Sequence, residues 1–219
     1  MGAMKIVAIS DTHLTHNFKI PDGDVLVHAG DLSVYGSKNE VSEGIDFLKS
    51  LPHEHKIFIS GNHDLYLENL SETKLKTLTQ GIHYLCNSAV DIDGVKFYGS
   101  PWTPHILPFQ DHYWTYWGYN LPRRKMKEQW AAIPLDTKVL ITHGPPRGVG
   151  DRYIRFHCTF RVGCSELRKK VAEIKPRLHI FGHAHDGYGL VEKDGTIFAN
   201  ASICHYKGDG INKPLVVNL

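Results

Sequence analysis

The sequence predicts an α/β layer fold, and two features of its amino-terminal part carry that prediction. Three short apolar runs, each followed at once by polar residues, are typical of buried strands: Lys5–Ile9, Asp24–Ala29 and Lys56–Ile59. Between the second and third runs lies Asn39–Ser50, where apolar residues recur at an imperfect helical spacing until Pro52 breaks the chain. The order strand, strand, helix, strand is typical of α/β layers.

The middle of the chain continues this alternation. Leu65–Gly81 is expected to be helical towards its end, and Ser88–Tyr98 is expected to form a hairpin because Asp93-Gly94 is a typical turn dipeptide. Further along, the apolar patterns predict helices at Arg123–Ala132 and Gly163–Ile174 and strands at Lys138–Thr142 and Arg177–Phe181.

The tail, Gly187–Leu219, alternates strand and turn signals around Asp194-Gly195. Its last run, Lys213–Leu219, is expected to close a second sheet. We expect residues 1–219 to form a single domain, since 219 residues suffice for one sizeable core. Met1, Gly2 and Ala3 precede a second methionine and are expected to be a cloning remnant outside the fold.

Residues 100–122 are rich in aromatic side chains and contain no clear period. We interpret this segment as a long ordered loop insertion or lid, since loops of this length in a compact domain usually serve a function. Most of its rings are expected to pack as a satellite core, and one or two to stack on a nucleobase. The aromatic residues of this segment are Trp102, Phe109, Tyr113, Trp114, Tyr116, Trp117 and Tyr119.

The composition excludes several classes of protein. Hydrophobic residues make up 42% and charged residues 22% of the chain, and the net charge of +2 favours neither a membrane surface nor duplex nucleic acid as a partner. No apolar run approaches the roughly 18 residues of a membrane span. Cysteines occur at 86, 158, 164 and 204 without a C-x-x-C motif, so we expect reduced thiols in a cytoplasmic protein with no signal peptide.

Polar clusters follow five of the predicted strands: Asp11 and His13, Asp31, Gly61-Asn62-His63-Asp64, His143, and His183 and His185. Each cluster alone could be a turn or a helix cap. Residues two apart in extended chain leave on the same side, and the carboxyl ends of parallel strands meet at one sheet edge where ligands bind. Five polar clusters at predicted strand ends favour one shared site over five independent turns or caps. The 15 histidines of the chain also favour metal chemistry.

The candidate ligands are too many for one ion, and they suit two ions about 3.5–4 Å apart that share a carboxylate. The set combines carboxylate, imidazole and amide groups without a thiolate, which favours Mn, and then Fe or Zn, over a structural zinc or a calcium site. The seven candidate ligands are Asp11, His13, Asp31, Asn62, His143, His183 and His185.

In their order, these motifs resemble those of the calcineurin-like metallophosphoesterases: Asp-x-His, Gly-Asp, Gly-Asn-His-Asp, a later His, and Gly-His-x-His. The resemblance covers nearly the whole chain, and further stretches make it most similar to the MPPED-type, class III-like cyclic nucleotide phosphodiesterases. These stretches are His28-Ala29-Gly30-Asp31, Gly99-Ser100-Pro101-Trp102-Thr103-Pro104, Trp117-Gly118-Tyr119-Asn120-Leu121-Pro122, Thr142-His143-Gly144-Pro145-Pro146 and His185-Asp186-Gly187-Tyr188-Gly189.

The resemblance implies a four-layer α/β/β/α sandwich with two mixed sheets and a dinuclear site at one edge. It also implies how the ligands divide between the ions. One metal would be bound by Asp11, His13 and His185, the other by Asn62, His143 and His183, with Asp31 bridging.

The resemblance further implies that Asn62 and His63 contact the substrate phosphate, and that His63 is catalytic with Asp64 orienting it from behind. Two cations would neutralise phosphate oxygens and lower the pKa of a water towards about 7, and hydroxide would attack phosphorus in line. His63 would stabilise the phosphoryl charge or protonate the leaving oxygen.

The expected function is hydrolysis of small phosphodiesters, cyclic nucleotides foremost, and the sequence leaves the oligomeric state open, a dimer included. A phosphomonoesterase or protein phosphatase is an alternative within the same chemistry. A non-catalytic interaction module with this fold is an alternative of another class, and the complete ligand set opposes it. Two further histidines inside apolar strands, His28 and His179, are expected to be core residues.

Overall fold

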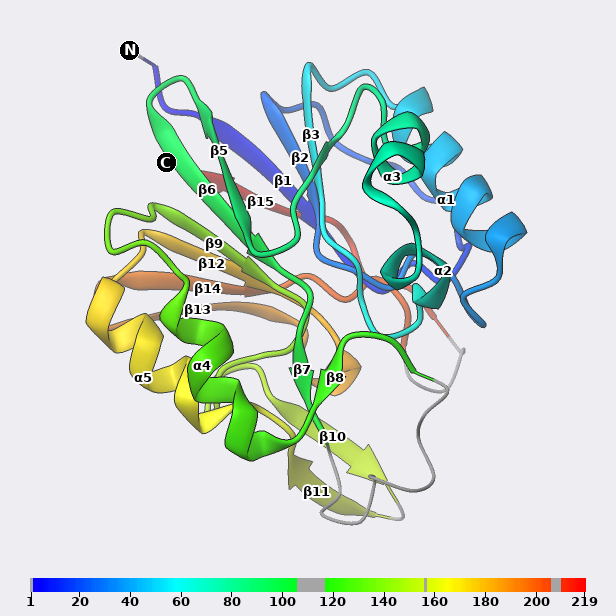
Figure 1. Cartoon of the computed structure of the whole chain (residues 1–219). Helices are drawn as coiled ribbons and strands as arrows, with labels where there is room; N and C mark the ends of the chain where they lie inside the picture. Colours follow the sequence, from blue (N-terminus) through cyan, green and yellow to red (C-terminus); the bar gives the residue numbers. More distant parts are fainter. Residues whose placement is uncertain (1, 106–116, 156, 206–209) are drawn as a thin grey trace.

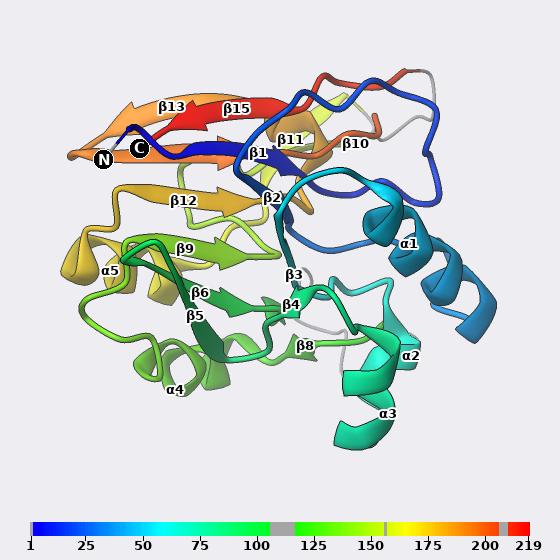
Figure 2. The ribbon, with the colours of Figure 1, turned by 90° about the horizontal axis from the view of Figure 1, so that it is seen from above.

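The computed structural model describes residues 2–105, 117–155, 157–205 and 210–219, and contains two main β-sheets flanked by helices (Figures 1 and 2). The first sheet has the strand order β15-β1-β2-β3-β4, in which β1 to β4 are parallel and β15 is antiparallel to β1. Its strands are β1 (Lys5–Ile9), β2 (Val25–His28), β3 (His55–Phe58), β4 (His83–Tyr84) and β15 (Leu215–Asn218).

The second sheet has the order β13-β14-β12-β9-β6-β5, with four parallel central strands and an antiparallel strand at each edge. β5 and β6 form the expected hairpin, and both turn residues, Asp93 and Gly94, have positive φ, as a type I′ turn requires. The strands are β5 (Ser88–Ile92), β6 (Val95–Ser100), β9 (Val139–Thr142), β12 (Leu178–Phe181), β13 (Gly189–Lys193) and β14 (Thr196–Asn200).

The helices cover the outer faces of the two sheets (Figure 1). On the first sheet lie α1 (Lys38–Ser50), α2 (Leu65–Glu68) and α3 (Glu72–Leu78). On the second sheet lie the 3₁₀ turn η1 (Arg123–Lys125), α4 (Met126–Ala131) and α5 (Ser165–Ile174), and a further 3₁₀ turn, η2 (His185–Gly187), follows β12. The two mixed sheets flanked by helices confirm the predicted fold class. Within the described residues, no helix combines the length and apolar character that crossing a bilayer requires.

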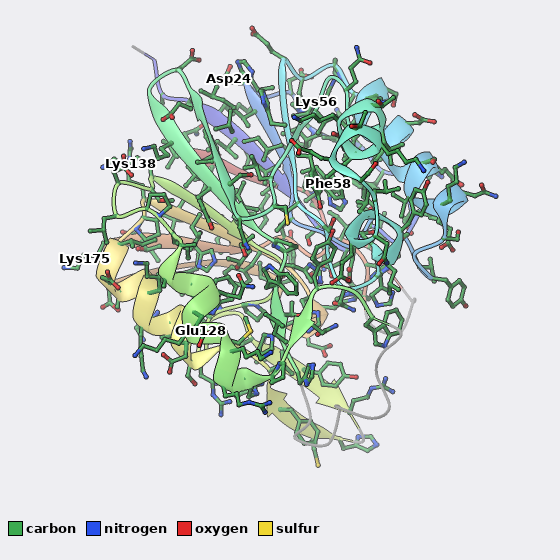
Figure 3. The ribbon with its side chains drawn as sticks, in the orientation of Figure 1. Asp24, Lys56, Phe58, Glu128, Lys138 and Lys175 are labelled. Carbon is green, nitrogen blue, oxygen red and sulfur yellow. The ribbon has the colours of Figure 1, made fainter. Side chains whose placement is uncertain are left out.

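The hydrophobic core divides into three clusters that correspond to these layers. One cluster lies between the sheets, a second between the second sheet and α4 and α5, and a third between the first sheet and its helices. Phe58 of β3 belongs to the third cluster and is fully buried, whereas Lys175 and Glu128 lie at the outer surface (Figure 3). Burial on both faces explains why the central strands appear in the sequence as continuous apolar runs.

Helix α1 begins at a capping box that also fixes the loop before it. The Ser37 hydroxyl accepts a hydrogen bond from the Glu40 backbone, and the Glu40 carboxylate accepts from the backbone N–H groups of Ser37 and Tyr35. This capping anchors the loop between β2 and α1, which carries Asp31 at one end.

Two short strand pairs were not expected from the sequence. β7 (Thr103–Pro104) pairs with β8 (Asn120–Leu121), and β10 (Arg152–Arg155) pairs with β11 (Cys158–Arg161). Within the predicted aromatic loop, Trp102 packs against the second core cluster and the ring of the buried Tyr119. Phe109, Tyr113, Trp114 and Tyr116 lie outside the described residues.

The carboxyl-terminal strand is present as predicted, but it belongs to a different sheet from the expected one. The sequence predicts that Lys213–Leu219 closes the second sheet, but β15 pairs with β1 at the edge of the first sheet. The pairing places both ends of the described chain side by side, since Met4 and Leu219 exchange backbone hydrogen bonds. The four cysteines are free thiols, as expected.

His179 is buried in the core of the second sheet, as the sequence predicts. Its Nε2 donates to the Thr142 hydroxyl at 2.8 Å, because that hydroxyl itself donates to the Gly144 carbonyl. Its Nδ1 has no hydrogen-bond partner among the described residues. Burial therefore lowers the pKa of His179 from 6.5 to about 3. His28 is likewise fully buried, and its pKa is lowered to about 3 by the same cause.

We expect His179 to make the fold sensitive to acid. Between pH 6.5 and about pH 3 the unfolded chain binds a proton at His179 that the folded chain does not bind, so the free energy of unfolding falls as the pH falls. The contribution approaches about 1.4 kcal/mol per pH unit. His179→Gln, which stays neutral, should show a shallower pH dependence when urea unfolding is compared at pH 7 and pH 5. Identical pH dependence in both proteins would contradict the prediction.

Candidate metal centre

The polar clusters predicted at five strand ends come together at one edge of the molecule. β1, β2 and β3 of the first sheet and β9 and β12 of the second direct their carboxyl ends to the same side (Figure 2). The side chains that follow them form overlapping groups whose ligand atoms lie within 4.8 Å of one another. These groups are Asp11, His13 and His185; His13, Asp31 and His63; and Asp31, His143 and His183.

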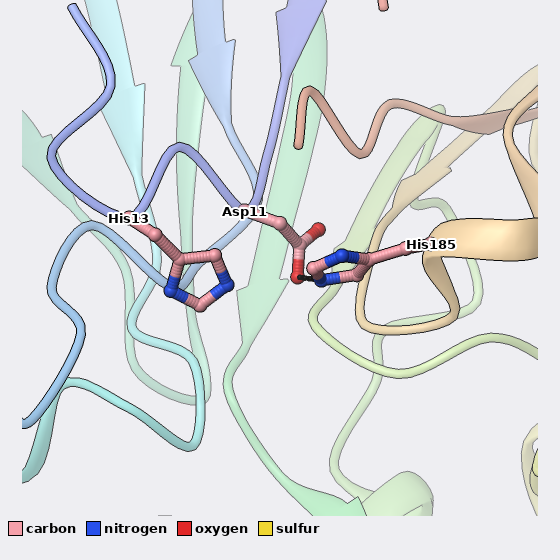
Figure 4. A group of neighbouring side chains, drawn as sticks. All are labelled: Asp11, His13 and His185. Atoms are coloured by element: carbon pink, nitrogen blue, oxygen red, sulfur yellow. Dashed lines mark ion pairs between the residues drawn. The ribbon is translucent and has the colours of Figure 1, made fainter. Parts of the chain in front are cut away.

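The first group is centred on Asp11, a fully buried carboxylate (Figure 4). Its Oδ1 lies 3.2 Å from His185 Nε2, and the His13 ring lies on its other side. The carboxylate also accepts hydrogen bonds from the His183 backbone N–H at 3.0 Å and the Ser202 hydroxyl at 2.9 Å. Burial raises the pKa of Asp11, but the neighbouring His185 outweighs it and holds this pKa well below its usual range.

The group of Asp31, His143 and His183 is centred on the Asp31 carboxylate, and the Asn62 side chain lies beside it. The Oδ2 atom of Asp31 lies 3.3 Å from His143 Nε2, which in turn lies 3.0 Å from the Asn62 Oδ1. The His143 and His183 rings are 5.0 Å apart. Burial opposes the protonation of His143, but the charge of Asp31 prevails and raises the pKa of His143 to about 9. A buried carboxylate that is surrounded by imidazole groups also provides a suitable environment for a bound metal cation.

One oxygen of Asp31 faces both groups. Asp31 Oδ2 lies 3.3 Å from His143 Nε2, 3.9 Å from His13 Nε2 and 4.0 Å from His63 Nε2. Three imidazoles from three different strand ends therefore converge on this carboxylate. This is the position that a carboxylate shared by two ions would occupy.

The histidines have the orientation that metal ligands need. The Nδ1 atoms of His13, His63 and His143 lie 2.8, 2.6 and 2.9 Å from the backbone carbonyls of Ser33, Val34 and Ala29, respectively. A carbonyl can only accept, so each Nδ1 carries a proton and each Nε2 points to the cluster, where it binds a cation once it has no proton. In addition, His185 Nδ1 is buried with no hydrogen-bond partner among the described residues. The residues present therefore fit a pair of divalent cations.

Strained backbone accompanies the cluster. Asp11, His13, Asp31 and His183 all have positive φ, between 43° and 64°, a region that non-glycine residues seldom adopt. Backbone strain of this kind persists where tertiary contacts override the local φ/ψ preference of a residue, and it is common at functional sites. The neighbouring glycine at 182 is required sterically, because a Cβ there would collide with the Asp11 carboxylate and the Ser10 side chain.

His63 lies at the outer side of the cluster, between the Val34 carbonyl and an aromatic wall. Its ring is 4.7 Å from the His13 ring in an edge-on arrangement and 4.0 Å from the Trp117 ring. The Gly118 backbone N–H donates to the Asn62 carbonyl at 2.8 Å, which fixes the chain after Trp117 on the segment that carries His63. Trp117 was not among the predicted site residues, although the aromatic segment that contains it was singled out.

The expected pairing of Asp64 with His63 is wrong. The buried Asp64 carboxylate accepts hydrogen bonds from the backbone N–H groups of Gly61, Asp31 and Ser33, at 2.8 to 3.1 Å, and from the Ser33 hydroxyl at 2.9 Å. Burial is the largest cause of the raised pKa of Asp64. Asp64 thus joins the loops after β2 and β3, and the Val34 carbonyl orients the His63 ring instead.

Three supporting residues were not predicted from the sequence. Ser33 and Val34 act through backbone carbonyls, which any residue type supplies, so no motif identifies them. Ser202 follows β14, a strand whose end was not among the five, and its hydroxyl bridges Asp11 and the Asn200 side chain. The one signal in the sequence is the spacing of Asn200 and Ser202, two polar residues that lie two apart at the end of an apolar run.

Comparison with known proteins agrees with this geometry. The profile of the family described as Calcineurin-like phosphoesterase matches residues 4–187. The human Metallophosphoesterase domain-containing protein 1 is 38% identical over 100% of this chain and 72% of its own length. The UPF0046 protein K07C11.7 of Caenorhabditis elegans is 38% identical over 97% of this chain and 74% of its own length.

A solved crystal structure supports the fold alone. It is 15% identical in sequence, covers 94% of this chain and 92% of its own, and superposes with a TM-score of 0.66. The family profile and the relatives at 38% identity span the strand ends that carry the candidate ligands. The chain therefore belongs to the calcineurin-like metallophosphoesterase family.

Proposed function

We propose that this protein is a metal-dependent phosphodiesterase that hydrolyses small phosphodiesters, cyclic nucleotides foremost. One observation carries the proposal: polar residues from five strand ends form overlapping groups, two of which contain Asp31, and three imidazole Nε2 atoms are turned towards its carboxylate. Hydrolysis of phosphoester bonds is the chemistry typical of the family to which the chain belongs.

The ligands divide naturally between two ions. Asp11, His13 and His185 would hold one, and the second would be held by Asn62, His143 and His183. Asp31 would be shared, because its carboxylate belongs to the group that contains His13 and to the group that contains His143. We propose Mn as the resident metal, with Fe or Zn as alternatives that the same donor set accepts.

The chemistry divides between the ions and the chain. When bound, two divalent cations supply Lewis acidity towards phosphate oxygens and lower the pKa of a water towards about 7. The chain's own contribution is orientation: backbone carbonyls fix the tautomers of His13, His63 and His143. His63 presents Nε2 towards the Asp31 side of the cluster, where the doubly protonated ring can donate its Nε2 proton to a departing oxygen and become neutral.

The preference for diesters tests the proposal. The metal-loaded protein should hydrolyse bis-p-nitrophenyl phosphate at a higher kcat/KM than p-nitrophenyl phosphate, because His63 and Trp117 form a wall beside the cluster that a second ester group can contact. A panel of 2′,3′- and 3′,5′-cyclic nucleotides then identifies the substrate class. A clear preference for the monoester would establish the phosphomonoesterase alternative. Absence of hydrolysis after loading with Mn, Fe and Zn in turn would support the non-catalytic module.

A further inference from the structure

The β10–β11 hairpin forms a ribbon that neither main sheet incorporates (Figure 1). Its strands pair Arg152 with Arg161 and Tyr153 with Phe160, which places each pair on a common face. Every described residue of the two strands except the half-buried Tyr153 is exposed, so both faces of the ribbon meet solvent. A two-stranded ribbon alone is at best marginally stable, and this one buries little apolar surface of its own.

The ribbon concentrates positive charge. Residues 147–161 contain four arginines and one acidic residue, a net charge of +3, whereas the whole chain carries only +2. The remaining 204 residues therefore carry a net charge of −1. Arg152 lies directly opposite Arg161 across the strands, and Asp151, 2.8 Å from Arg161, supplies one negative charge for the two arginines. Like charges in this position are destabilising unless an anion lies against them.

Exposed apolar and aromatic side chains accompany this charge. Phe160 is 50% exposed and lies opposite Tyr153 on one face, and Ile154 is 45% exposed on the other. The Arg155 guanidinium lies 5.6 Å from the centroid of the Tyr153 ring, and its Nε donates to the Tyr153 hydroxyl at 2.6 Å. Rings beside guanidinium groups are the combination on which unpaired bases stack while arginines contact the phosphates.

The ribbon is joined to the metal centre. The Ile154 backbone N–H donates to the Asp186 carboxylate at 2.7 Å, and Asp186 directly follows the candidate ligand His185. Figure 2 shows the ribbon on the side to which the carboxyl ends of β9 and β12 point. A chain bound along the ribbon would therefore pass beside the five strand ends.

We propose that the β10–β11 ribbon is a docking surface for single-stranded nucleic acid. Its charge complements a phosphodiester backbone, and Phe160 and Tyr153 offer surfaces to bases that are not stacked in a duplex. Four-residue strands, about 13 Å long, supply no channel for a duplex. Delivery of the bound strand to the metal centre for cleavage rests on the function proposed above, but the binding itself does not.

The binding is measured by fluorescence anisotropy with a fluorescein-labelled, single-stranded 12-mer DNA, in EDTA so that no cleavage occurs. Arg152→Ala combined with Arg155→Ala should weaken binding at least tenfold. It should also reduce the slope of log affinity against log salt concentration by about 0.7 for each phosphate that is no longer neutralised. Phe160→Ala should weaken binding by about tenfold, as loss of one stacked base does. The control, Lys38→Ala with Lys74→Ala, removes two exposed charges from α1 and α3 and should bind as the unmodified protein does.

The docking surface would be overturned by unchanged affinity in the arginine variant, or by equal affinity for a blunt duplex of the same sequence. Competition by heparin with no loss in Phe160→Ala would also overturn it, since the ribbon would then be a general anion surface. The ribbon variants should hydrolyse bis-p-nitrophenyl phosphate normally and unfold at the same temperature as the unmodified protein. Failure of diester hydrolysis in all proteins, with DNA binding intact, would refute the proposed function and leave the docking surface standing.

Discussion

Asp31→Asn should reduce phosphodiester turnover by on the order of 10³-fold or more. The substitution keeps the size of the side chain but removes the negative charge that three imidazole Nε2 atoms approach within 3.3 to 4.0 Å. Because Asp31 belongs to two of the three ligand groups, the loss affects both proposed ions at once. The Mn content should fall from near two ions per chain to below one at limiting metal.

Steady-state kinetics and elemental analysis on the same preparations measure this effect. Asp136→Asn is the matched control: Asp136 is an exposed carboxylate that pairs with Lys96, so the same substitution there should alter neither turnover nor metal content. An Asp31→Asn protein that kept two ions and normal turnover would refute the shared carboxylate.

His183→Ala distinguishes the two proposed metal sites, since His183 belongs only to the group of Asp31 and His143. It should empty mainly one site and leave weak activity that returns at high Mn concentration. A different response from the two variants is expected, because Asp31 contacts both groups and His183 only one. Full activity of His183→Ala at limiting metal would show that His183 is not a ligand.

Much of the fold and most of the centre could be predicted because both depend on continuous sequence signals. A strand buried on both faces needs an unbroken apolar run, so β1, β2, β9 and β12 were visible. The residue after such a run lies at the sheet edge, which is why His143 and His183 could be placed there without knowledge of the tertiary structure. Spacing alone could not assign each histidine to an ion, and that division remains a proposal.

The incorrect or missing predictions have a common physical cause. In each case the structure depends on contacts between residues that are distant in sequence, or on backbone groups that every residue type carries. The sheet that β15 joins depends on which edge is open, and Lys213–Leu219 carries no residue that distinguishes the edge at β1 from one in the second sheet. The Asp64 carboxylate is adjacent to His63 in sequence but serves backbone N–H groups at Gly61, Asp31 and Ser33. The β10–β11 ribbon shows no alternation because neither face is buried.

The position of His63 leads to the second large expected effect, which depends on the leaving group. Its Nδ1 lies 2.6 Å from the Val34 carbonyl, so that nitrogen carries a proton, and Nε2 faces the cluster 4.0 Å from Asp31 Oδ2. A proton on Nε2 can pass to a departing oxygen, and such help is worth roughly 10²–10⁴-fold. It matters for a basic ribose alkoxide and little for a nitrophenolate, which leaves without a proton.

His63→Ala should therefore lower kcat/KM for a cyclic nucleotide by roughly 10²-fold or more, with a much smaller loss for bis-p-nitrophenyl phosphate and unchanged metal content. Trp117→Ala removes the ring that packs 4.0 Å from His63 and should give the same pattern at smaller amplitude, with Trp117→Phe restoring most of the rate. Equal losses on both substrates would mean that His63 stabilises phosphoryl charge instead. Loss of an ion in His63→Ala would make His63 a ligand, as its place beside His13 and Asp31 permits.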